Sequence, residues 1–65
     1  MITRIDLIEG LANMCGSALK KISEQKFQNY CNALSKFSNE LLCQEYFKAT
    51  GNLIRPILSN QFIYV

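Results

Sequence analysis

The sequence predicts an all-α protein, a small helical hairpin that completes a bundle by homodimerisation. Apolar residues recur at steps of three and four over most of residues 4–49, which is the spacing of amphipathic helices. Helix-capping residues precede the two longest of these stretches. A chain of 65 residues also buries too little apolar surface to be comfortably stable alone. We therefore expect a second copy to complete the core of one helical domain over residues 1–65.

The first predicted helix covers residues 4–22. Thr3 is its expected N-cap, with Asp6 three residues later as in a capping box. The helix carries two adjacent apolar rows, which predict contact with two neighbours at once. The rows are Ile5, Ile8, Ala12, Cys15, Leu19 and Ile22, and beside them Leu7, Leu11, Met14 and Ala18. The first helix has two possible ends: Gly16 could stop it, or it could continue until Ser23 caps the next helix. The first apolar row keeps its spacing past Gly16, which favours the end near Ser23.

The second predicted helix covers residues 24–49. Its apolar stripe comprises Phe27, Tyr30, Cys31, Leu34, Phe37 and Leu41. Beyond Leu41 the stripe rotates, which indicates either a curved helix or a break at Ser38–Asn39, because both residues are good caps. Lys48 and Gly51 mark the C-terminal end of the segment. The core expected for the dimer consists of Ile5, Ile8, Leu11, Ala12, Cys15, Leu19, Phe27, Tyr30, Leu34, Phe37 and Leu41.

The last segment, residues 52–65, is an apolar tail. Pro56 suits a first helical turn, so residues 56–62 are compatible with one or two turns of helix. Residues 62–65 are aromatic and β-branched, which equally favours an extended strand. A small domain gains stability from each large apolar side chain that it buries. We therefore expect Phe62, Ile63 and Val65 to dock on the helices of the same chain or of the second copy.

The residue types argue against catalysis, cofactors and metals. The chain has no histidine and five carboxylates, and its three cysteines are odd in number and widely spaced. Asp6 and Glu9 are adjacent on the first helix, where the helix dipole favours solvated acids. Free cysteines are typical of a reducing compartment, so we expect a cytoplasmic protein. No signal peptide is expected, because Arg4, Asp6 and Glu9 interrupt the first apolar stretch, and no membrane span is expected, because no apolar run approaches about 18 residues.

The aromatic residues carry the functional prediction. Tyr46 and Phe47 are adjacent on a helix, so they point in different directions and cannot both enter one core. Exposed aromatics carry much of the energy of protein interfaces. Together with Phe62 and Tyr64, they are the candidate residues for binding a partner protein. The sequence thus predicts a non-enzymatic interaction module, such as an inhibitor, anti-activator, adaptor or secretion chaperone, from a bacterial or phage source.

The alternative function is that of a small dimeric nucleic-acid-binding transcriptional regulator. Lys20, Lys21 and Lys26 form the one basic cluster in the sequence, near the junction of the two predicted helices. Phosphate binding would require such lysines to face the duplex together. The net charge is only +2 and is spread thinly along the chain, so protein binding is the preferred interpretation.

Overall fold

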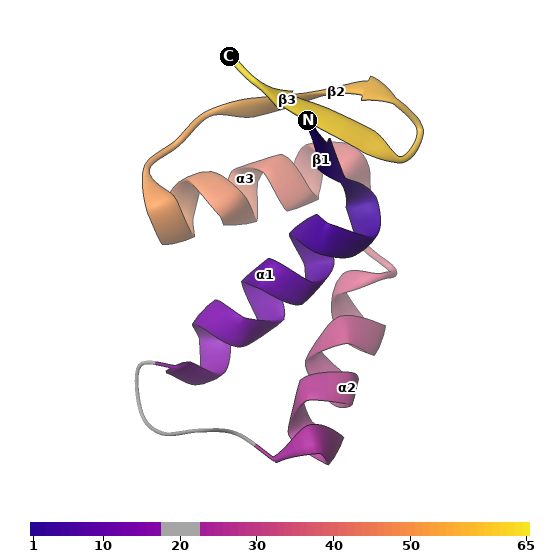
Figure 1. Cartoon of the computed structure of the whole chain (residues 1–65), viewed down its shortest axis with the longest axis vertical. Coiled ribbons are helices and arrows are strands. Elements are labelled where there is room, and N and C mark those ends of the chain that lie inside the picture. The colour runs from indigo at the N-terminus through magenta and orange to yellow at the C-terminus, as the bar shows by residue number, and fades with distance from the viewer. Residues whose placement is uncertain (18–22) are drawn as a thin grey trace.

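Three helices lie on one side of a three-stranded antiparallel sheet (Figure 1). The computed structural model describes the backbone of residues 1–17 and 23–65 and the side chains of residues 1–14 and 23–65. The elements, in chain order, are β1 (Ile2–Thr3), α1 (Arg4–Ser17), α2 (Glu24–Leu34), α3 (Asn39–Thr50), β2 (Ile54–Leu58) and β3 (Gln61–Tyr64). The described fold is therefore a two-layer arrangement of mixed α and β structure.

The prediction of an all-α hairpin and helical bundle is wrong in two places. The segment predicted as one helix over residues 24–49 forms two helices, because α2 ends at Leu34 and α3 begins at Asn39. The hydroxyl of Ser38 accepts a hydrogen bond of 3.2 Å from the amide of Leu41 and caps α3. Of the two alternatives for this segment, a curved helix or a break at Ser38–Asn39, the break is therefore correct. The second error concerns the tail, which forms a β-hairpin.

The other predicted helix ends are confirmed where the structure describes them. The Asp6 amide donates to the Thr3 hydroxyl over 3.1 Å, and the Lys26 amide donates to the Ser23 hydroxyl over 3.2 Å. Gly51 ends α3 with φ at 78°, a left-handed conformation that glycine adopts without strain. Residues 18–22, which the sequence predicts as the end of the first helix, lie outside the described residues.

The tail supplies two of the three strands. The order of the strands is β1-β3-β2, and both neighbouring pairs are antiparallel. Phe62 pairs with Ile2 on one side and with Pro56 on the other, so β3 is the central strand. The helical alternative for residues 56–62 is therefore wrong. Pro56 is tolerated in β2 because this strand lies at the edge of the sheet, where a missing N–H breaks no ladder hydrogen bond.

The core lies between the sheet and the helices. Its buried side chains are Leu7, Ile8, Leu11, Ala12, Leu34, Leu42, Ile54 and Phe62. Of the residues predicted for the dimer core, Ile5 is 68% exposed, and Tyr30 and Leu41 are also exposed. Both rows of α1 contribute to this core, Leu7 and Leu11 from one and Ile8 and Ala12 from the other, because α1 packs against α2 and α3. From the tail, Phe62 docks as predicted, whereas Val65 is 78% exposed.

Arg4 joins three segments that are distant in the sequence. Its guanidinium donates to Asn39 Oδ1 over 2.6 Å, to the Phe37 carbonyl over 2.7 Å and to the Ser35 carbonyl over 3.0 Å. Its backbone amide donates to the Asn60 carbonyl over 2.7 Å. These bonds fasten the start of α1 to the α2–α3 turn and to the β2–β3 turn. The sequence indicated Arg4 only as one of the dispersed charges.

Candidate functional site

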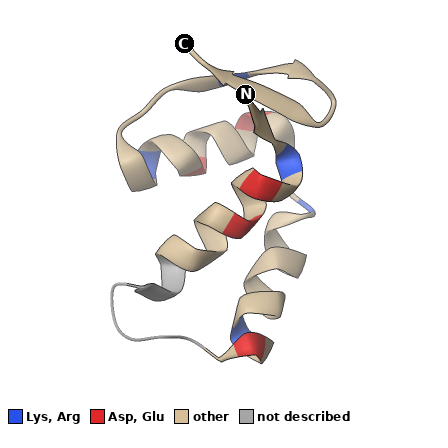
Figure 2. Ribbon diagram, in the orientation of Figure 1, with Lys and Arg blue, Asp and Glu red and all other residues tan. Residues whose placement is uncertain are grey.

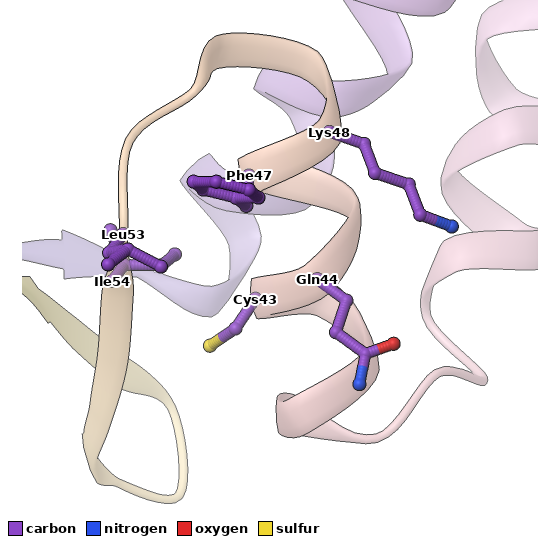
Figure 3. Close-up of a pocket in the computed structure, with 6 residues that line it drawn as sticks. All are labelled: Cys43, Gln44, Phe47, Lys48, Leu53 and Ile54. Carbon is purple, nitrogen blue, oxygen red and sulfur yellow. The ribbon is translucent and has the colours of Figure 1, made fainter.

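An open, mostly apolar groove lies between α3 and the start of β2 (Figure 3). Its volume is roughly 360 Å³, and it is called the α3–β2 groove below. The lining residues are Cys43, Gln44, Phe47, Lys48, Leu53 and Ile54. Phe47 and Cys43 extend from α3 toward β2, whereas Gln44 and Lys48 extend away from the strand (Figure 3). The groove therefore combines one face of a helix with the beginning of an edge strand.

The turn between α3 and β2 determines the shape of the groove. Gly51 reverses the chain in its left-handed conformation, and its amide donates to the Phe47 carbonyl over 2.8 Å. The Thr50 hydroxyl donates to the Tyr46 carbonyl over 2.8 Å and accepts from the Asn52 amide over 3.1 Å. These bonds hold the turn, so Leu53 and Ile54 return beside the last turns of the helix.

The groove exposes large apolar side chains beside a buried floor. Phe47 is 47% exposed and Leu53 is 58% exposed, whereas Ile54 is only 6% exposed. Lys48 lies at the rim, with its ammonium 3.3 Å from the Glu45 carboxylate. Apolar side chains around a concavity, with charges at the rim, are typical of surfaces that bind another protein. The arrangement is thus suited to receive an apolar side chain of a partner.

Cys43 contributes a neutral thiol to the groove. Burial, with a smaller effect from the Glu40 carboxylate, raises the pKa of the Cys43 thiol above its ordinary value of 9.0. The pKa of Cys31 is raised in the same way, by burial and then by Glu9. Both thiols are free. A protonated thiol is a poor nucleophile, so Cys43 acts in the groove as a small apolar group.

The four predicted partner-binding residues occupy three different environments. Phe47 lies in the α3–β2 groove. The Tyr46 and Tyr64 hydroxyls are 2.9 Å apart and their ring centroids 6.4 Å apart, so this pair joins α3 to β3. The hydrogen bond with Tyr46 raises the pKa of the Tyr64 hydroxyl. Phe62 is fully buried under the sheet and contributes to the core rather than to the surface.

The basic cluster is described only in part. Lys26 is exposed in the first turn of α2, beside Glu24, whereas Lys20 and Lys21 lie outside the described residues. Figure 2 shows the described charges dispersed over several elements, with positive and negative segments next to each other at the start of α2. The described part of the surface therefore does not present a single basic face.

Sequence reasoning singled out Phe47 but did not find the rest of the groove. The sequence presents Cys43 only as one of three widely spaced cysteines and Leu53 only as part of the tail, and no pattern in it places them together. A usable signal is the helix stop at Gly51, followed after Asn52 by the apolar pair Leu53 and Ile54, because a tight reversal returns such residues to the end of the helix.

The part of the chain that the structure describes has neither a metal-binding cluster nor a membrane-spanning helix. No group of three or more His, Cys, Asp or Glu side chains among residues 1–14 and 23–65 is arranged to hold a metal ion. None of the helices there has the length and apolar character needed to cross a membrane.

No model of a known protein family, no curated protein and no solved structure matches this chain.

Proposed function

We propose that the chain is a small, non-enzymatic module that binds a partner protein through the α3–β2 groove. The observation that supports this proposal is the exposure of Phe47 and Leu53 in a groove that the buried Ile54 also lines. A domain of this size gains stability by burying such side chains. Leaving two of them exposed around a concavity favours their use in recognition.

The proposal extends to the biological role and location. Inhibitors, anti-activators, adaptors and secretion chaperones act by binding alone, and each is compatible with one apolar groove on a small scaffold. The free thiols of Cys31 and Cys43 support a reducing compartment, such as the cytoplasm of a bacterium.

Affinity capture from the native host tests the groove as the binding site. The bait is the wild-type chain, compared with Phe47→Asp and with the control Gln28→Asp. Gln28 is exposed on α2, outside the groove lining and outside the residues predicted for a dimer core. We expect a protein that is captured by the wild type and by Gln28→Asp and is lost with Phe47→Asp, because a carboxylate in an apolar groove is poorly solvated. Loss with Gln28→Asp alone would contradict the proposal, and circular dichroism confirms that each bait is folded.

Homodimerisation is a further part of the proposal. Ile5, Tyr30 and Leu41, which the sequence places in a dimer core, are exposed in the single chain and are available to a second copy. Sedimentation equilibrium at micromolar concentrations should show a species of twice the 7.4 kDa chain mass. A single 7.4 kDa species would contradict self-association without affecting the groove.

Nucleic-acid binding makes a different prediction. A regulator that uses Lys20, Lys21 and Lys26 would shift a duplex in a gel, and the shift would weaken steeply with salt. The groove proposal predicts no such shift at low salt. A salt-sensitive shift that Lys26→Ala weakens would favour the regulator instead.

A further inference from the structure

The strand β2 has a free edge beside the α3–β2 groove. It pairs with β3 on one side, and no other described strand flanks it. The Val65 amide donates to the Leu53 carbonyl over 3.0 Å, so the main-chain groups of Leu53 face β3. These groups alternate sides along an antiparallel strand. Arg55 therefore also faces β3, whereas the main-chain groups of Ile54 and Pro56 face outward.

The opposite side of β3 supports this alternation. The Asn60 carbonyl accepts from the Arg4 amide, so Asn60 faces β1. Counting along β3, Phe62 then faces β1 while Ile63 faces β2, and Ile63 is the residue paired with Arg55. The free edge of β2 thus offers three main-chain groups: the N–H and C=O of Ile54 and the C=O of Pro56, which has no N–H.

These groups and the groove are placed for an added strand. A peptide that pairs antiparallel with β2 can exchange two hydrogen bonds with Ile54 and donate a third to Pro56. Directly opposed residues in a sheet point to the same face. The peptide residue opposite Ile54 therefore points to the helix side, where the groove exposes Phe47 and Cys43.

The charge of Arg55 indicates which residue the peptide carries opposite it. Arg55 is exposed, lies on the face of the sheet opposite to the helices, and makes no ion pair within the described residues. The peptide residue opposite Arg55 occupies a non-hydrogen-bonded position, where opposed side chains are closest. A carboxylate there would pair with the guanidinium.

The same charge disfavours a second copy that pairs about Arg55. Two β2 strands in that antiparallel register would place two guanidinium groups opposite each other, which is destabilising. Each copy of Pro56 would also lack the N–H that the other strand requires. A strand that carries a carboxylate opposite Arg55 avoids this repulsion and pairs with the guanidinium instead.

We propose that the free edge of β2 and the α3–β2 groove bind an extended segment of a partner protein by antiparallel strand addition. The segment carries Asp or Glu opposite Arg55 and an apolar residue directly after it, opposite Ile54, in the groove. This proposal rests on the proposed function and adds the chemistry of the partner.

Selection from a displayed library of random peptides tests this pairing. The wild-type chain should enrich peptides with an acidic residue followed directly by an apolar one, and Phe47→Asp should abolish their binding. Arg55→Glu should reverse the preference at the first position from acidic to basic residues. Enrichment of apolar residues at helical spacing, or no enrichment, would overturn the proposal.

Backbone methylation of a selected peptide tests the strand geometry. Methylation of the apolar residue removes the peptide N–H that donates to the Ile54 carbonyl, and it should weaken binding about tenfold. Methylation of the acidic residue is the matched control, because its N–H faces away from β2, and should change affinity less than about twofold. Equal effects at the two positions would overturn strand addition. Affinity that falls as protein concentration rises would place a second copy on the edge and would also overturn it.

The two proposals fail in distinguishable ways. A captured partner that is lost with Phe47→Asp, but retained with Arg55→Glu and not displaced by the selected peptide, would support the groove and refute strand addition. If Phe47→Asp still bound both the partner and the selected peptide, both proposals would be refuted.

Discussion

Replacement of Phe62 by alanine should unfold most of the protein. Phe62 is fully buried in the central strand, between β1 and β2. Burial of an aromatic side chain removes about 200 Å² from water, worth about 5 kcal/mol at about 25 cal/mol per Å². Phe-to-Ala changes in cores accordingly cost about 3–5 kcal/mol. Because a domain of this size has a total stability of only about 3–5 kcal/mol, the loss is comparable to the whole.

Urea denaturation followed by circular dichroism measures this loss. Phe62→Leu is the graded variant and should cost about 1 kcal/mol, so that the transition remains measurable. Val65→Ala is the surface control, since Val65 is 78% exposed, and should stay within about 0.5 kcal/mol of the wild type. A Phe62→Ala protein with the urea midpoint of the wild type would refute the docking of the tail on the helices.

Substitutions and reactivity at three further residues, Arg4, Gly51 and Cys43, test the fold. Arg4→Met should lower the free energy of unfolding by about 2–3 kcal/mol, because three oxygen acceptors lose a charged donor, whereas Lys36→Met should change it by less than about 0.5 kcal/mol in the same urea assay. Gly51→Ala should cost about 1 kcal/mol in thermal denaturation, since φ of 78° is strained for alanine, and an unchanged melting temperature would contradict the left-handed cap. Cys43 should react with iodoacetamide more slowly in the folded than in the urea-unfolded chain near pH 9, because its raised pKa leaves less thiolate. Because its pKa is raised on folding, the Cys43 thiol favours the folded state while it is protonated. The free energy of unfolding of the wild type should therefore fall more steeply than that of Cys43→Ala as the pH rises above 9. The same pH dependence of this free energy in both proteins would contradict the raised pKa.

Helix ends were predictable from the sequence because their causes are local. Thr3 and Ser23 each accept a hydrogen bond from an amide three residues later, and Gly51 adopts its left-handed cap. Ser38 was indicated as a cap but left as an alternative, since the apolar stripe continues past it. Such interactions span a single turn, so residue types at fixed offsets reveal them.

The sheet was not predictable because its pairings are distant. Its shortest strand, β1, has two residues, and it forms only because Phe62 and Gln61 return to it from the other end of the chain. Pro56 favours a first helical turn by its fixed φ, and only the position of β2 at the sheet edge makes it acceptable in a strand. Which side chains of α1 are buried depends likewise on the elements packed against the helix, so the sequence does not reveal that Leu7 is buried while Ile5 is exposed.

The candidate site was predictable to the extent of one side chain. Phe47 was indicated because Tyr46 and Phe47 cannot share a core, and Phe47 is the more exposed of the two. The groove around it forms only when the Gly51 turn returns Leu53 and Ile54 to α3. The free edge of β2 depends on the strand order, which no local pattern encodes.

Amide hydrogen exchange at Ile54, measured by NMR with and without a saturating selected peptide, tests the central claim most directly. Strand addition predicts that exchange of the Ile54 amide slows markedly in the complex, because the peptide covers this outward N–H. The Arg55 amide, which faces β3 in the free protein, should change little and serves as the internal reference. A bound peptide that leaves Ile54 exchange unchanged would contradict the claim that this edge is the binding site.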